Sequence, residues 1–162
     1  MSDFTIRVED ADVLAALHRV AGVLSDPTPL AGELAALGES STRLRFRTQT
    51  GPDGVAWKQS LRAKVTGGRT LTQDGHLSGS LSSRHGRDFG EWGVNRIYAA
   101  IHQFGGMIRP VNAKALRFQL ASGGFAVVKS VTMPARPYLG ISDDDRGDIL
   151  DAIERALAPA GA

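Results

Sequence analysis

The histidines are the side chains best suited to acid–base or metal chemistry, because the chain of 162 residues contains no cysteine. His18 lies on the polar side of a predicted amphipathic helix. His76 and His85 lie in polar, glycine-containing segments without the His-x-x-x-His or Glu-x-x-His spacing that puts two metal ligands on one helix face. The sequence therefore predicts no metal site and no cofactor.

His102 is the one histidine whose position favours a defined role. It follows Tyr98 by four residues, so both rings project from the same face of a predicted helix. A hydrolase would also need a nucleophile and an orienting group, and no spacing selects Ser78, Ser80 or Asp88 for these roles. We expect no enzyme activity, and we predict that His102 is a hydrogen-bonded, partly buried residue at a subunit contact.

The acidic triplet Asp143–Asp145 lacks the alternating oxygen ligands and final glutamate of a calcium loop. It suits the start of a helix, where carboxylates oppose the positive end of the helix dipole. The glycines form neither a phosphate-binding loop nor a dinucleotide fingerprint. Nothing in the sequence therefore supports nucleotide binding.

The charge is unevenly distributed, although the net charge is only +2. Residues 1–42 contain seven acidic and two basic residues, and residues 143–155 contain six acidic and two basic residues. Residues 43–87 contain nine basic and two acidic residues, a balance of +7. Such a basic centre could bind a polyanion or the acidic face of a neighbouring subunit. The alternative is a solvated basic loop without a partner.

Double-stranded DNA is one polyanion that this centre suits. Within this centre, a basic loop over about 51–71 carries a single aromatic residue, Trp57. Proteins that bind single-stranded nucleic acid alternate aromatic and cationic side chains. No helix-turn-helix or zinc finger is present, so any contact would be non-specific. The residues predicted to line a DNA channel or to contact DNA from the loop are Arg43, Arg47, Lys58, Arg62, Lys64 and Arg69.

The elements that position these residues begin with a short alternating strand, Phe4–Val8. A helix capped by Asp10 or Asp12 follows, and the Asp-Pro-Thr-Pro segment at 26–29 ends it. A second helix is predicted from about Leu30 to Thr48. The first helix has the spacing of one buried stripe. Its apolar positions are Val13, Leu14, Leu17, Val20, Ala21 and Leu24.

Beyond the turn Gly51–Gly54, a long basic loop is predicted over about 51–71. Shorter elements come next: a short helix over 74–82, a strand over 84–94, a brief helix over 97–104 stopped by two glycines, and a hairpin over 116–131. Ser142 is expected to cap the final helix. The buried face of that helix is predicted to be Ile149, Leu150, Ile153 and Leu157.

Helices at both ends around these strands predict an α+β fold, with a central antiparallel sheet flanked by N-terminal helices and a C-terminal helix. The length fits a single domain over 1–162. No stretch approaches the roughly 18 apolar residues of a membrane span, and no secretory signal is visible. We expect no membrane partner.

Several segments occur in a fixed order: Phe46 with Gly51–Trp57, Leu71–Leu77 with Ser80-Leu81, Val94-Asn95 with Tyr98–Gly106, and Met133–Gly140 before an acidic helix. Together they resemble the phage virion morphogenesis (tail-completion) family, which includes Mu-like phage proteins. Asp74 stands where that family usually has threonine. The resemblance covers about residues 40–158.

The resemblance implies a structural bacteriophage protein without catalytic residues. The expected role is a tail-completion or neck (head–tail joining) subunit, present in the virion after assembly in the host cytoplasm. It implies a homo-oligomeric ring, with a hexamer favoured, and neighbouring neck, connector or tail-tube proteins as partners. The alternative is a non-specific DNA-binding module acting alone, whose affinity for duplex DNA would fall steeply with salt.

Pro134 and Pro137 bracket Arg136 in an extended segment that presents its side chains rigidly. Tyrosine and arginine are frequent interface anchors. Tyr138 and Leu139 would also lock the last helix onto the sheet, and we expect both roles. The predicted subunit or partner interface is Trp57, Tyr98, His102, Phe104, Arg136 and Tyr138.

Overall fold

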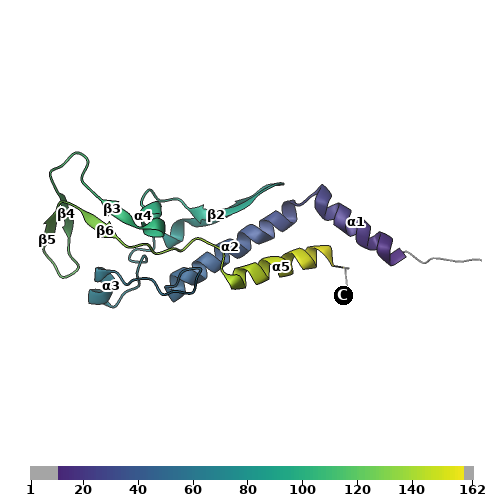
Figure 1. Ribbon diagram of the computed structural model, residues 1–162, viewed down its shortest axis with the longest axis horizontal. Coiled ribbons are helices and arrows are strands. Elements are labelled where there is room, and N and C mark those ends of the chain that lie inside the picture. Colours follow the sequence, from purple (N-terminus) through teal and green to yellow (C-terminus); the bar gives the residue numbers. More distant parts are fainter. Residues whose placement is uncertain (1–10, 159–162) are drawn as a thin grey trace, which may run out of the picture.

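The computed structural model describes residues 11–158, so the predicted strand Phe4–Val8 lies outside the described residues. The molecule is elongated (Figure 1). Helix α2 (Thr28–Thr48) forms its axis, with α1 (Ala11–Ser25) at one end and α5 (Asp143–Leu157) packed along one side. No helix of this part of the chain is long and apolar enough to cross a membrane.

Helices α1 and α2 are where the sequence predicts them, and α2 starts two residues before Leu30. Pro29 fits the first turn of α2, where no backbone N–H is needed, and Asp26 Oδ1 accepts from Thr28 N at 3.2 Å. The buried stripe predicted for α1 is wrong, because α1 contacts little of the chain besides α5. Its exposed apolar residues are Val13, Leu14, Leu17, Val20 and Leu24.

Within residues 11–158 the strands form three two-stranded antiparallel sheets. β1 (Leu81–His85) pairs with β2 (Gly90–Val94), β3 (Gly106–Ile108) with β6 (Val131–Met133), and β4 (Leu116–Gln119) with β5 (Phe125–Val128). The α+β class and the antiparallel pairing are confirmed, as is the hairpin predicted over 116–131. The strands do not join into one central sheet. The single strand predicted over 84–94 is instead the end of β1, the turn and the second strand of the β1–β2 hairpin.

The β1–β2 hairpin lies against α2 on the side away from α5 (Figure 1). Small residues on α2 permit this approach: a Cβ on Gly38 would lie 2.4 Å from the Trp92 ring. Trp92 Nε1 donates to Thr42 Oγ1 at 3.1 Å, and Thr42 is fully buried. Any larger side chain at Gly38 would push the hairpin off the helix.

The basic segment 51–71 is more ordered than a long loop. The predicted turn is present, with Gly54 at φ +73°. Trp57 is buried within the chain, although the sequence predicts it at an interface. Helix α3 (Leu61–Thr66) follows, capped by Ser60, whose Oγ accepts from Ala63 N at 3.1 Å. A short helix therefore interrupts the predicted loop.

Two short helices complete the fold. The helix predicted over 74–82 is a single 3₁₀ turn, η1 (Ser78–Ser80). α4 (Ala99–Phe104) is shorter than predicted, and Phe104 at its end is 78% exposed. Gly105 stops α4 at φ +70°, where a Cβ would lie 2.6 Å from Ala135 N, so only glycine allows this close approach.

The core is a small aromatic cluster in which Phe46 contacts both Trp57 and Tyr138, at ring-centroid distances of 5.6 and 5.2 Å. Leu77 completes it. Tyr138 belongs to the extended segment Pro134–Gly140, which we call the strap. Its hydroxyl donates to Ala99 O at 3.1 Å, and burial raises its pKa to about 12, so it remains a donor at neutral pH.

Arg45 joins the strap to two helices. Its guanidinium donates to Tyr138 O at 3.2 Å and Gly140 O at 2.8 Å, and it pairs with Asp145 at the start of α5. Asp145 and Ser142 also form the predicted capping box, which explains the acidic triplet as a helix start. Burial works to raise the pKa of Asp145, but hydrogen bonds from Ser142 and Ser41 and the charge of Arg45 outweigh it and hold this pKa below its ordinary value.

Replacing Arg45 by methionine should lower the free energy of unfolding by about 3 kcal/mol, because Asp145 and two carbonyls would keep their burial and lose their partner. Urea unfolding followed by circular dichroism measures this change. Arg84→Met is the matched control, since its ion pair with Glu91 is exposed and should contribute little. Equal effects of the two substitutions would contradict the role of Arg45.

Candidate functional site

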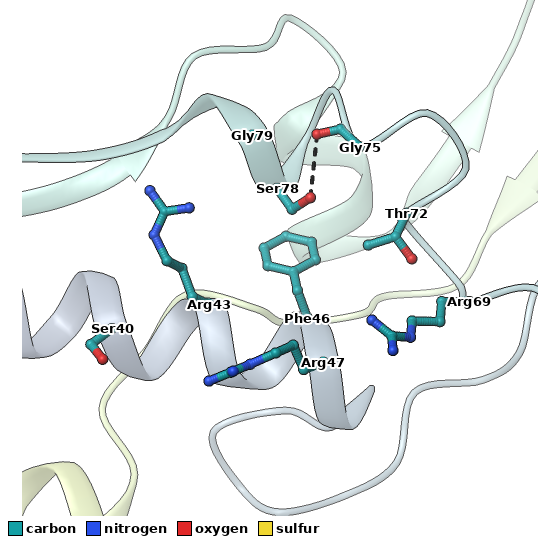
Figure 2. A pocket seen from close by; sticks show the side chains of 9 residues that line it. All are labelled: Ser40, Arg43, Phe46, Arg47, Arg69, Thr72, Gly75, Ser78 and Gly79. Carbon is teal, nitrogen blue, oxygen red and sulfur yellow. Dashed lines mark hydrogen bonds between the residues drawn. The ribbon is translucent and has the colours of Figure 1, made fainter.

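Three of the six cations predicted to contact DNA come together at one groove of about 440 Å³. We call it the arginine groove; it lies between the C-terminal half of α2 and the segment 69–79 (Figure 2). It is lined by Ser40, Arg43, Phe46, Arg47, Arg69, Thr72, Gly75, Ser78 and Gly79. The local spacing explains part of this arrangement, because Arg43 and Arg47 are four apart on one face of α2.

The arginines of this groove differ in their partners. Arg43 donates to Glu39 Oε1 at 2.6 Å and to Leu81 O at 3.0 Å. Within residues 11–158, the guanidinium groups of Arg47 and Arg69 donate to no acceptor. Two guanidinium groups without acceptors, in a groove that also contains the exposed Ser40, suit a phosphate or a carboxylate.

The other three predicted cations, Lys58, Arg62 and Lys64, line a second groove of about 690 Å³. We call it the strap groove, because Pro134 and Arg136 of the strap form part of its wall. It lies between the α3 segment on one side and α4 with β6 on the other. The predicted cations are therefore divided between two neighbouring grooves, which share Gly75.

The predicted interface residues fall into a buried group and an exposed group. Trp57, Arg136 and Tyr138 are at least 92% buried within the chain. Trp57 Nε1 donates to Pro137 O at 2.8 Å, and Arg136 Nε donates to Lys58 O at 2.7 Å, so both hold the strap. The hydroxyl of Tyr138 holds the strap to α4 rather than to the last helix, and the link to α5 runs through Arg45, which donates to Tyr138 O and pairs with Asp145.

Tyr98 and Phe104 remain available to a partner. They are 41% and 78% exposed. Tyr98 and His102 lie edge to face, with ring centroids 5.9 Å apart, so the expected shared helix face is present. Their role in an interface remains a prediction.

His102 is partly buried as predicted, but its Nδ1 is shielded from water and has no hydrogen-bond partner among the described residues. Burial lowers its pKa, and the nearby Arg136 guanidinium lowers it further. The imidazole is therefore neutral at pH 7. The serines considered as nucleophiles are bonded within their own turn, with Ser80 Oγ donating to Leu77 O at 2.8 Å.

Residues 11–158 contain no group of three His, Cys, Asp or Glu side chains that could hold a metal ion.

Sequence reasoning missed Gln103 as the second support of the strap. Gln103 Oε1 accepts from Tyr138 N and Leu139 N, each at 3.0 Å, and its Nε2 donates to Leu139 O at 2.9 Å. It is a polar residue inside the Tyr98–Gly106 segment, between the apolar positions Ile101 and Phe104. A polar residue at that position indicates a side chain that needs a hydrogen-bond partner. The local sequence does not identify that partner, which lies 35 residues away.

Comparison with known proteins gives one consistent result. The phage virion morphogenesis family model matches residues 8–158. The chain is similar to the Mu-like prophage FluMu G protein 2 of Haemophilus influenzae, with 31% identity over 88% of this chain and 87% of that protein. It is also similar to the putative capsid assembly protein G of Escherichia phage Mu, with 30% identity over 98% of this chain and 96% of that protein. No solved structure matches the chain significantly.

The lowered pKa of His102 predicts a pH-dependent stability. Below about pH 6.5 the unfolded chain takes up a proton on this imidazole while the folded chain resists it, so the free energy of unfolding should fall as the pH falls from 6.5. His102→Gln should remove this part of the slope in urea unfolding at a series of pH values. His76→Gln, at an exposed position, controls for the loss of an imidazole, and an unchanged slope in His102→Gln would refute the assignment.

Proposed function

Because the chain belongs to the phage virion morphogenesis family, we propose that it is a structural tail-completion or neck subunit that assembles into a ring. Proteins of this family are typically structural and not enzymatic. The ring would join neighbouring neck, connector or tail-tube proteins and would remain in the virion at the tail or head–tail junction. A closed ring of identical copies, with six favoured, fits this role.

The observation that carries this proposal is the exposed apolar stripe of α1. A stripe with the spacing of a buried face is predicted from the sequence, yet four of its leucines and valines are 47–73% exposed in the single chain. These residues are Val13, Leu14, Leu17 and Leu24. Apolar surface of this continuity usually marks a protein–protein contact. Assembly would supply the burial that the single chain lacks.

The position of this stripe favours head-to-tail contacts. α1 lies at one end of the elongated molecule, and the β4–β5 hairpin, with exposed Phe118 and Phe125, lies at the other (Figure 1). Different patches at opposite ends support heterologous contacts, which close into rings when the rotation between copies allows it. The acidic ends and basic centre of the chain add charge complementarity to such contacts.

The experiment that tests the proposal combines light scattering with micrographs of phage. The purified chain should form a closed oligomer, and Leu17→Glu should reduce it to monomer without unfolding it, because Leu17 is 59% exposed. Phage carrying only Leu17→Glu should accumulate heads and tails that are not joined. Gold label on a tagged wild-type subunit should lie at the neck or tail end.

Val55→Glu is the matched control, since Val55 is 63% exposed in the turn after α2. It should leave both the oligomer and the virions intact. Label distributed over the capsid shell, or normal virions from Leu17→Glu phage, would rule out the proposed position.

A second candidate, non-specific contact with duplex DNA, is favoured by the arginine groove. If Arg47 and Arg69 contact phosphates, Arg47→Glu with Arg69→Glu should weaken binding uniformly across sequences. The slope of log affinity against log salt should fall by about two, one for each lost contact. Lys114→Glu with Lys129→Glu, on exposed positions outside both grooves, is the control of equal charge. Absence of salt-dependent DNA binding at low ionic strength would remove this candidate.

A further inference from the structure

The strap groove includes strand β6 in its wall. Four consecutive residues, Val131–Pro134, line it, and three of them form β6. Among the described residues β6 pairs only with β3, so its second edge keeps N–H and C=O groups without a strand partner. An edge of this kind accepts an extended segment by strand addition.

The side chains around this edge are both apolar and cationic. Leu61 is 76% and Phe118 40% exposed where they line the groove. The charged groups are Lys58, Arg62, Lys64 and Arg136 against a single carboxylate, Asp74. The groove therefore suits an extended segment that alternates apolar side chains and carries negative charge.

One segment of this chain has that chemistry. Residues 1–10 alternate at Phe4, Ile6 and Val8, and they contain three carboxylates against one arginine, Arg7. Side chains at every second position of a strand point to one face, so these three would enter the groove together. Asp3 and Glu9 lie at the intervening positions of this strand, so they would face the rim of the groove and meet its long cationic side chains there.

We propose that residues 3–9 of one copy bind as a strand along β6, in the strap groove of a neighbouring copy. The inference deepens the proposed function, since it rests on copies of the chain lying side by side in a ring. Each copy would donate one N-terminal arm and accept one, which is a heterologous contact that a ring can close.

The reach of the chain requires a neighbouring copy. Residue 11 begins α1 at the end of the molecule opposite to α3 and β6 (Figure 1). The 21 residues of α2 alone span about 32 Å. From Val8 to Ala11 the chain spans at most about 10 Å. The arm therefore cannot reach the groove of its own chain.

The absence of cysteine permits a direct test by disulfide cross-linking. Full-length chains with one cysteine in the arm (Phe4→Cys, Ile6→Cys or Val8→Cys) are mixed with Leu61→Cys chains and oxidised. A disulfide requires Cβ atoms about 3.5–4.5 Å apart. At least one arm variant should give a mixed dimer in several-fold higher yield than with the control Val127→Cys, which is 65% exposed on the β4–β5 hairpin.

Two further measurements test whether the cross-link depends on binding of the arm in the strap groove. An excess of a peptide with the sequence of residues 1–10 should lower the cross-link yield, whereas a scrambled peptide of the same composition should not. Lys58→Glu with Lys64→Glu in the Leu61→Cys chain should lower the yield several-fold, and Lys114→Glu with Lys129→Glu should leave it unchanged. Circular dichroism confirms that each variant is folded.

The possible failures are distinguishable. Oligomers without a cross-link above the Val127→Cys level would overturn the arm contact and leave the proposed function standing. A chain that stays monomeric at every concentration would overturn both. Loss of DNA binding in Lys58→Glu with Lys64→Glu, without any effect of the peptide, would make the groove a nucleic-acid site and overturn the arm contact as well.

Discussion

The buried guanidinium of Arg45 is the interaction on which the rest of the structure depends. A buried cation has to be satisfied where it lies, and here its acceptors are two strap carbonyls and the carboxylate that starts α5. This fixes the strap against α2, and the strap in turn holds α4 through Gln103 and the Trp57 segment through Arg136. The hydrophobic core is small, so polar contacts with defined geometry set the relative positions of these elements.

Much of the fold follows from local patterns in the sequence. The helical spacing predicts α1 and α2 to within about two residues, and Ser142 with Asp145 predicts the capping box of α5. The turn at Gly51–Gly54 and the hairpin β4–β5 follow from proline and glycine positions. In each case the residues that decide the structure lie within a few positions of one another, so the sequence alone contains the information.

The candidate site was less predictable, because its contacts join distant parts of the chain. Arg45 meets Gly140, 95 residues later, and no spacing within α2 indicates that partner. Likewise, the division of the predicted cations into two grooves depends on how α3 and segment 69–79 lie against α2 and β6. The burial predicted for the stripe of α1 was wrong for a different reason. The spacing identifies an apolar face that should be buried, but it does not say whether the residues that bury it belong to the same chain.

The late position of the strap in the sequence has a consequence for synthesis. Tyr138 closes the aromatic cluster on Phe46, which is made 92 residues earlier. At typical translation rates that interval is roughly 5–20 s. During it the nascent chain exposes Phe46 and Trp57 together with the stripe of α1, a combination that invites premature association. A host chaperone, or a slow rate of initiation that keeps nascent copies apart, would protect the chain until the strap emerges.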